Sequence, residues 1–325
     1  MIVVQTPLRV SFLGGGTDFQ QFYRREEGCV LSTAIDKYIY VIIKRCFDAR
    51  VRIAYTRTEL VDRLDDVQHD LVREAMRLAG IDRQVELATM GDIPSEGSGL
   101  GSSSTVTVGC LNALYTYRGE AHTAADLAEQ ACRIEIGTLR RPIGKQDQYI
   151  AAYGGLRFIR FHEDNAVTVE RVALDADTER RLARSLMLFY TGMTRDAATI
   201  LREQVAHTRS HVSVLRGLKA LAWEGRGCLE RGDPDALGRL MHEGWLLKRC
   251  LASTITNPAI DALYERAHRA GALGGKISGA GGGGFLLLYV PVERQDAVRR
   301  ALKGLAELPC ALEPDGSKVI LNIRR

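Results

Sequence analysis

The sequence lacks the long apolar segment that a membrane-spanning helix requires. Its longest apolar run is GFLLLYV, residues 284–290, whereas a helix needs about 20 apolar residues to cross a bilayer. The first ten residues, MIVVQTPLRV, are interrupted by Gln5, Pro7 and Arg9, which argues against a secretory signal peptide. We therefore expect a cytoplasmic protein with no membrane partner.

The chain also lacks a block of like charges and any C-x-x-C pair. Its 44 basic and 40 acidic residues are spread along all 325 positions, so nucleic acid is not an expected partner. The seven cysteines are an odd number and fall mostly at apolar positions, which is typical of reduced thiols in a cytosolic protein. The seven histidines show no metal-ligand spacing, so the sequence does not indicate a zinc site.

The hydrophobic periodicity predicts a strand-rich first half and a helix-rich second half. Strands are expected at residues 7–13, 29–35, 38–47, 50–56, 85–90, 185–192, 285–290 and 317–323. Helices are expected at about residues 17–28, 65–79, 106–117, 123–141, 194–231, 235–251, 257–271 and 292–305. The polar stretch at 165–180 suggests a boundary between two lobes, residues 1–170 and 171–325.

Glycine is abundant, and the stretch GSGLGSSST at residues 97–105 leads from a predicted strand into a predicted helix. Glycine allows close backbone approach, and a helix N-terminus offers unpaired N–H groups and a positive dipole end. Together they favour a polyphosphate site. The stretch is neither a Walker A loop, since no Lys precedes the Ser/Thr, nor a dinucleotide fingerprint, since Ser102 stands where the third glycine is required. A flexible surface loop with a serine cap is the alternative.

Two further glycine-rich stretches are PLRVSFLGGGTD at residues 7–18 and SGAGGGGF at residues 278–285. The first could be a tight turn with Asp18 capping the next helix. The second matches G-x-G-x-x-G, but a strand follows it where a dinucleotide-binding fold needs a helix. A β-turn or bulge would explain part of it, while four consecutive glycines favour close approach of the backbone to a ligand.

Two carboxylates complete the pattern. Glu135 falls on the apolar stripe of the helix that starts near Thr123, together with Ala131 and Ile134, and a buried charge is rarely left without a partner. Asp147 follows in GKQDQYIAAYGG. Either residue could be part of a structural ion pair. Beside a phosphate loop, one could hold Mg²⁺ on the nucleotide and the other could act on an acceptor hydroxyl.

These motifs, in this order, resemble those of the GHMP kinases over essentially the whole chain. PSEGSGLGSSST resembles that family's phosphate loop, with Ser104 and Thr105 in place of two alanines. PLRVSFLGGGTD resembles its first motif, although Gly15 and Gly16 replace Glu and His, and KISGAGGGGF resembles its third. The resemblance implies a two-lobed α+β fold, with a left-handed β-α-β unit in the N-terminal lobe, a ferredoxin-like C-terminal lobe and the nucleotide between them.

Within the family, GGGTD, FYTGMTRDA and MHEGWLLKRCLA are similar to kinases that act on D-glycero-D-manno-heptose 7-phosphate in GDP-heptose synthesis. The resemblance implies ATP-dependent phosphorylation of the anomeric hydroxyl to give the 1,7-bisphosphate, with Mg²⁺ as cofactor. Kinases for L-fucose, mannose or galactose remain alternatives, as does a non-catalytic sensor of sugars or nucleotides. A homodimer is left open.

The resemblance also assigns residues. Asp147 is expected to act at the acceptor hydroxyl, and Arg9 to hold that carboxylate ionised and stabilise the transferring phosphoryl group. ATP is expected at Pro94, Gly97, Ser98, Gly99, Leu100, Gly101, Ser102, Ser103 and Ser104, and Mg²⁺ at Ser103 and Glu135. The sugar is expected at Gly15, Gly16, Thr17, Asp18 and Asp147, and its phosphate at Arg195, Lys276, Gly281, Gly282 and Gly283, with Arg24, Arg25, Arg140, Arg141 and Lys145 in reserve.

Overall fold

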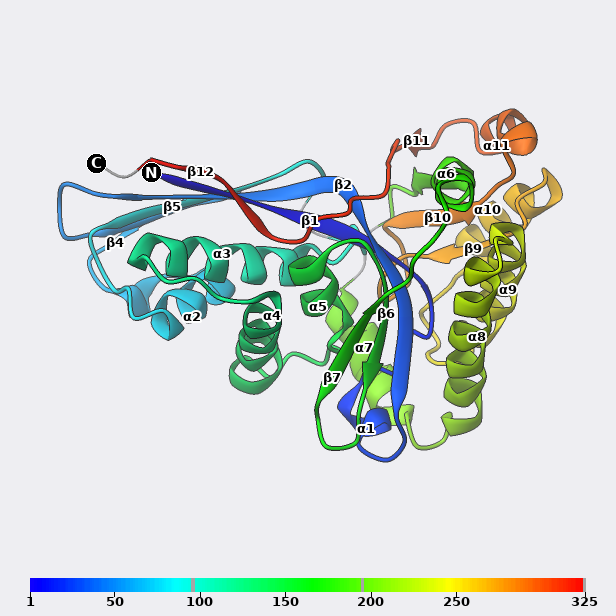
Figure 1. The fold of residues 1–325 in the computed structure, drawn as a ribbon, viewed down its shortest axis with the longest axis horizontal. Coiled ribbons are helices and arrows are strands. Elements are labelled where there is room, and N and C mark those ends of the chain that lie inside the picture. Colours follow the sequence, from blue (N-terminus) through cyan, green and yellow to red (C-terminus); the bar gives the residue numbers. More distant parts are fainter. Residues whose placement is uncertain (95–96, 194–195, 324–325) are drawn as a thin grey trace.

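Two β-sheets with helices packed on them form the computed structural model, which describes residues 1–94, 97–193 and 196–323 (Figure 1). The strands are β1 (Ile2–Leu13), β2 (Gly28–Arg45), β3 (Val51–Ala54), β4 (Thr58–Val61), β5 (Val85–Gly91), β6 (Leu156–Phe161), β7 (Val167–Arg171), β8 (Leu186–Tyr190), β9 (Gly274–Ile277), β10 (Phe285–Tyr289), β11 (Ala306–Glu307) and β12 (Lys318–Asn322). The α-helices are α1 (Gln20–Tyr23), α2 (Asp70–Leu78), α3 (Ser102–Arg118), α4 (Ala124–Cys132), α5 (Gln146–Tyr153), α6 (Ala176–Ser185), α7 (Ala197–His207), α8 (Val212–Glu230), α9 (Pro234–Lys248), α10 (Pro258–Arg269) and α11 (Gln295–Ala301). Short 3₁₀ turns lie at η1 (Leu64–Asp66) and η3 (Val292–Arg294), and η2 (Arg133–Thr138) is a π-helical turn.

The first sheet has eight strands in the order β12-β1-β2-β5-β3-β4, with β6 paired to β2 and β7 to β6. Helices α2, α3, α4 and α5 lie together below this sheet in Figure 1, and α3 packs on β1 and β2. The single parallel pair among the described strands joins β3 to β5, with α2 between them in the chain. This is a β-α-β unit; the left-handedness of its crossover stays a prediction.

The 18-residue strand β2 replaces the two strands expected at 29–35 and 38–47. Its register against β1 shifts where Pro7 faces Tyr38 and Leu8 faces Ile35, which leaves Asp36 and Lys37 without opposing residues. Such a bulge bends a strand without ending it. One half of β2 therefore pairs with β6 and the other half with β5.

The second sheet has four antiparallel strands in the order β11-β8-β10-β9. The first and third strands of this lobe in chain order, β8 and β10, occupy the two central positions of the sheet. Helices connect β8 to β9 and β10 to β11. This is the ferredoxin-like β-α-β-β-α-β arrangement, so the α+β class and the expected C-terminal lobe are confirmed.

Some predicted boundaries were wrong. The helix expected at 123–141 ends as α4 and continues as the π-helical turn η2, and the helix expected at 194–231 is divided into α7 and α8 within the described residues. Gly28 begins β2 instead of ending a helix, since α1 spans only Gln20–Tyr23. The division at residue 170 stays a prediction, but β12 crosses it by pairing with β1.

The larger apolar core contains residues of both sheets, including Val10 of β1 and Leu188 of β8. A second core contains Phe22 of α1 together with Leu215 and Leu218. The two sheets are thereby coupled through apolar packing. Among the described residues, none of the helices combines the length and the apolar character that a bilayer crossing demands.

Candidate active site

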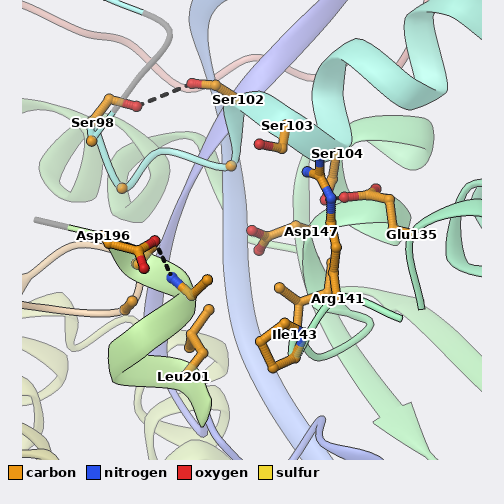
Figure 2. A pocket seen from close by; sticks show the side chains of 18 of the residues that line it. Ser98, Ser102, Ser103, Ser104, Glu135, Arg141, Ile143, Asp147, Asp196 and Leu201 are labelled. Carbon is orange, nitrogen blue, oxygen red and sulfur yellow. Dashed lines mark hydrogen bonds between the residues drawn. The ribbon is translucent and has the colours of Figure 1, made fainter. Parts of the chain in front are cut away.

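The loop before α3 brings backbone and hydroxyl groups to one cavity. Gly97, Gly99 and Gly101 have φ angles of +69°, +73° and +83°, which side-chain-bearing residues rarely adopt. The loop therefore turns sharply into α3, whose first turn carries the exposed hydroxyl of Ser103. The hydroxyls of Ser98 and Ser102 are hydrogen-bonded at 3.0 Å (Figure 2). These groups suit a polyphosphate.

The cavity beside this loop has a volume of about 450 Å³. The loop and the start of α3 form one wall, the start of α7 around Ala197 and Ala198 forms another, and Pro142, Ile143 and Leu201 add apolar surface. Of the residues predicted to bind ATP, the cavity is lined by Gly97, Ser98, Gly99, Gly101, Ser102, Ser103 and Ser104. This size is in the range of small-molecule sites.

Arg9 and Asp147 form a two-pronged ion pair at the end of the cavity. Nε of Arg9 donates to Oδ1 of Asp147 at 2.7 Å, and Nη2 donates to Oδ2 at 2.6 Å. Nη1 donates to the carbonyl of Gly99 at 2.6 Å. Arg9 lies on β1 and Asp147 in the first turn of α5, so one guanidinium fixes the carboxylate and the phosphate loop together. Asp147 points into the cavity in Figure 2.

Glu135 is fully buried in η2, yet its carboxylate reaches the cavity wall. Ser104 donates to its Oε2 at 3.2 Å, and the amide of Gln148 donates to its Oε1 at 3.1 Å. Burial raises the pKa of Glu135 to about 7. The π-helical turn is a feature often found at functional sites, and here it carries the carboxylate to the first turn of α3.

A smaller cavity of about 90 Å³ adjoins the first one. Both cavities are lined by Arg9, Asp147, Ile143, Leu201, Gly279 and Ala280. The smaller cavity also contains Asp18, which accepts hydrogen bonds from the backbone of Gly16 at 2.9 Å and from the side chain of Gln146 at 3.1 Å. Burial raises the pKa of Asp18. The Arg9–Asp147 ion pair thus lies between the cavity lined by the glycine- and serine-rich loop and a second cavity that contains the buried Asp18.

The family model of the GHMP kinases N terminal domain matches residues 68–155, and that of the GHMP kinases C terminal matches residues 226–307. The chain is 30% identical over 316 residues to the D-glycero-alpha-D-manno-heptose 7-phosphate kinase of Campylobacter jejuni, with 93% of each chain covered. The chain belongs to the GHMP kinase family. It is a sugar kinase and, as in other GHMP kinases, ATP is its phosphate donor.

Two further proteins are similar to this chain. The chain is 27% identical to the L-fucokinase/L-fucose-1-P guanylyltransferase of Bacteroides fragilis, over 91% of this chain and 35% of that protein. The crystal structure of a D-glycero-D-manno-heptose 1-phosphate kinase from Bacteroides thetaiotaomicron superposes with a TM-score of 0.83 and 24% identity, covering 100% of both chains. At that identity the superposition shows a shared GHMP kinase fold.

Several residues predicted for this GHMP kinase site do not line either cavity. Thr17 is fully buried, and its hydroxyl donates to the carbonyls of Gly14 and Cys29, so its role is structural. Leu100 is buried, Pro94 is exposed away from the cavity, and Arg195 lies outside the described residues. Gly15, Gly16 and Lys276 do line the smaller cavity.

The glycine run at residues 281–283 of the third GHMP motif does not line either cavity, and its role in substrate binding stays a prediction. The amide of Gly282 donates to the carbonyl of Ile255, and the amide of Gly284 to that of Met193, both at 2.8 Å. A Cβ on Gly283 would overlap the Met193 carbonyl. Gly281, Gly282 and Gly283 therefore pack backbone against backbone, and the neighbouring Gly279 and Ala280 reach the cavities.

Sequence reasoning missed Ser11, Lys248 and Gln146, all of which line the smaller cavity of this GHMP kinase. Ser11 follows Arg9 by two positions on β1, so strand alternation could have placed it on the same face. Lys248 follows the buried Trp245 by three positions on α9. The test that singled out Glu135, a charge on an apolar helix stripe, would have found Lys248 as well.

Proposed function

We propose that this kinase transfers the γ-phosphoryl group of ATP to the anomeric hydroxyl of D-glycero-D-manno-heptose 7-phosphate. The single observation that carries the proposal is the Arg9–Asp147 pair at the junction of the two cavities. A nucleotide on the phosphate loop would direct its terminal phosphate toward this junction, and a sugar beside Asp18 would approach it from the other side. The 30% identity to a heptose 7-phosphate kinase supports the choice of sugar.

In the proposed reaction, the loop amides and the hydroxyls of Ser102 and Ser103 hold the triphosphate at the N-terminus of α3. The anomeric oxygen attacks the γ-phosphorus while the bond to the leaving ADP oxygen breaks. Asp147 orients the hydroxyl and receives its proton. Because phosphoryl transfer passes through a loose transition state, that proton leaves late, and positioning contributes more than deprotonation.

Arg9 holds Asp147 in one orientation, since its Nε and Nη2 each donate a hydrogen bond to one carboxylate oxygen. Its third contact, with the Gly99 carbonyl, sets the distance between this carboxylate and the loop. Arg9 also places positive charge where the transferring phosphoryl group passes.

Mg²⁺ fits the donor set at the loop. The described residues contain no cluster of three or more His, Cys, Asp or Glu side chains able to enclose a metal; Mg²⁺ commonly takes only one or two protein ligands and fills the rest with phosphate oxygens and water. The Glu135 carboxylate and the exposed Ser103 hydroxyl would be those ligands. When bound, the ion would supply positive charge that offsets the negative charge developing on the phosphate groups.

The test is turnover measured side by side on heptose 7-phosphate, mannose, L-fucose and galactose by coupled ADP release. We expect kcat/KM for heptose 7-phosphate to exceed the others by roughly tenfold or more. Heptose 1-phosphate is the matched control: its anomeric oxygen is already blocked, so it should not be turned over. A preference for L-fucose would indicate that this kinase acts on the same sugar as the L-fucokinase relative from Bacteroides fragilis. No turnover on any acceptor would favour a non-catalytic sensor.

A further inference from the structure

Two lysines that the proposed mechanism does not use lie buried in the smaller cavity. Lys248, at the end of α9, is 8% exposed, and Lys276, on β9, is 6% exposed. The other charged residues that line this cavity are Arg9, Asp18 and Asp147. Arg9 is already paired with Asp147, so the ionised groups leave one positive charge in excess.

Within the described ranges, neither lysine has a carboxylate within salt-bridge distance. Nζ of Lys248 donates to the carbonyls of Ile277 and Gly279, and Nζ of Lys276 donates to the carbonyl of Phe12 at 3.4 Å. A buried ammonium group without a counter-ion is costly. Burial accordingly lowers the pKa of Lys276 to about 8 and that of Lys248 well below its ordinary value.

Uncharged groups in the same cavity also lack partners. The hydroxyl of Ser11, on a residue only 8% exposed, makes no hydrogen bond with any described residue, and neither does Oε1 of Gln146. Buried polar atoms are normally satisfied, so this arrangement favours a polar ligand. Sugar hydroxyls can pair with Ser11 and Gln146, while an anionic substituent would neutralise the lysines.

We propose that Lys248 and Lys276 bind the phosphate group that the acceptor sugar already carries, and thereby make the kinase select a phosphorylated sugar. The inference rests on the proposed function, because it assumes a sugar phosphate as acceptor. Asp147 then receives the hydroxyl to be phosphorylated, Asp18 binds ring hydroxyls, and the lysine pair holds the opposite end of the molecule. Each ammonium group has three N–H donors. Lys248 uses two of them and Lys276 uses one on backbone carbonyls, so three remain for a phosphate.

A third cavity, of about 280 Å³ beyond Asp18, is the competing location, since Arg140, Arg141 and Lys145 line it. Two of its cations are already engaged. Arg141 donates to both carboxylate oxygens of Asp70 at 2.9 Å, and Lys145 donates to the side chain of Asn165 at 2.7 Å. The lysine pair is the better site because its cavity also contains Arg9 and Asp147, where the acceptor hydroxyl would lie, whereas neither of them lines the third cavity.

The experiment compares two acceptors, heptose 7-phosphate and the same heptose without phosphate, in the wild-type enzyme and in Lys248→Met and Lys276→Met. Loss of one charge-assisted hydrogen-bonding group should raise KM for heptose 7-phosphate by roughly 10- to 100-fold. The value of kcat/KM for the unphosphorylated heptose should change less than about threefold. Lys145→Met tests the third cavity and should keep the wild-type preference.

Equal losses on both acceptors would overturn the proposal, because the lysines would then act on the transferred phosphoryl group or on the fold. Loss of the preference in Lys145→Met alone would overturn it in favour of the third cavity. Thermal unfolding of each variant identifies any that fail to fold, and the remaining lysine variant then decides.

A second measurement does not depend on the identity of the sugar. Inorganic phosphate is titrated calorimetrically into enzyme saturated with a non-hydrolysable ATP analogue, and we expect binding that weakens at least tenfold in both lysine variants. If phosphate binds and the lysine variants weaken its binding, while heptose 7-phosphate is not turned over, the proposed function fails and the lysine site stands. If heptose 7-phosphate is turned over and the variants keep its preference, the lysine site fails and the proposed function stands.

Discussion

At the scale of the residue, the chemistry depends on how one guanidinium holds one carboxylate. The side chain of Asp147 is 24% exposed and that of Arg9 only 5%, so the carboxylate is open to a substrate while its partner is not. We expect Asp147→Asn to lower kcat by roughly 10²- to 10⁴-fold, because the amide cannot receive a proton. The dissociation constant for ATP, measured by calorimetry, should remain within a few-fold. Turnover near the wild-type value would refute the role of Asp147.

Glu135 provides a second prediction at this scale. Glu135→Gln retains groups that can accept from Ser104 and pair with Gln148, but it removes the charge that would attract Mg²⁺. The Mg²⁺ concentration for half-maximal activity should therefore rise by roughly tenfold or more. Thermal unfolding is the control and should change little, since the side chain keeps its shape. An unchanged Mg²⁺ dependence would place the metal elsewhere.

Much of the residue-level site could be predicted from the sequence. The phosphate loop, Glu135, Asp147 and Arg9 belong to short motifs with a local physical reason, and all of them line one cavity. Ser11 and Lys248 could not be connected with that site in advance, because they come from elements 237 positions apart that only the folded chain brings together. Thr17 illustrates the opposite case: a polar residue inside a motif, whose hydroxyl supports the backbone instead of a ligand.

At the scale of the element, the phosphate loop is shaped by what it touches. A Cβ on Gly99 would clash with the Ser278 carbonyl, and φ is +73° there. Gly99→Ala should therefore cost roughly 1–3 kcal/mol of unfolding free energy and raise KM for ATP. Gly119→Ala is the matched control, since φ is +82° and nothing lies within 4 Å of a Cβ. That variant should cost about 1 kcal/mol and leave KM for ATP unchanged; equal KM effects would contradict the assignment.

The sequence predicted the type of most elements, helix or strand, better than it predicted their first and last residues. Alternation located the strands, but the sequence at Asp36 and Lys37 reads as a break where the structure has a bulge. The long helix expected at 123–141 contains the π-helical turn η2, whose extra width comes from hydrogen bonding that periodicity does not report. Of the two deviations, the π-helical turn bears on the site, because it carries Glu135 to the cavity wall.

At the scale of the whole molecule, the last strand returns to the first sheet. β12 pairs with β1, the strand that carries Arg9, and Ser317 hydrogen-bonds Thr6 at 2.8 Å. Deletion of residues 318–325 should lower the free energy of unfolding by roughly 1–3 kcal/mol, because β1 loses one neighbour and its hydrogen bonds. Denaturant titration measures this. The double substitution Val319→Thr and Leu321→Thr is the control: these side chains are exposed and the backbone pairing is kept, so it should be nearly neutral. Unchanged stability after the deletion would show that β12 contributes little.

The two-lobed architecture followed from the family resemblance more than from the patterns themselves. Periodicity yields a list of strands and helices, whereas the order of strands in each sheet depends on contacts between distant segments. The return of β12 has no local signal, since its pattern would suit either sheet. The ferredoxin-like order of the second sheet likewise rests on pairing of strands separated by four helices.

The contact of Gly99 with Ser278 and Gly279 has a consequence for natural variation. The loop before α3 and the loop after β9 come from opposite lobes and contact each other there through backbone atoms alone. A larger residue at Gly99 or Gly279 would therefore require the facing loop to move away. Substitutions in one loop should therefore be tolerated only in the company of compensating changes in the other. The ATP-binding loop and the third glycine motif are therefore expected to vary together, although about 180 positions separate them in the sequence.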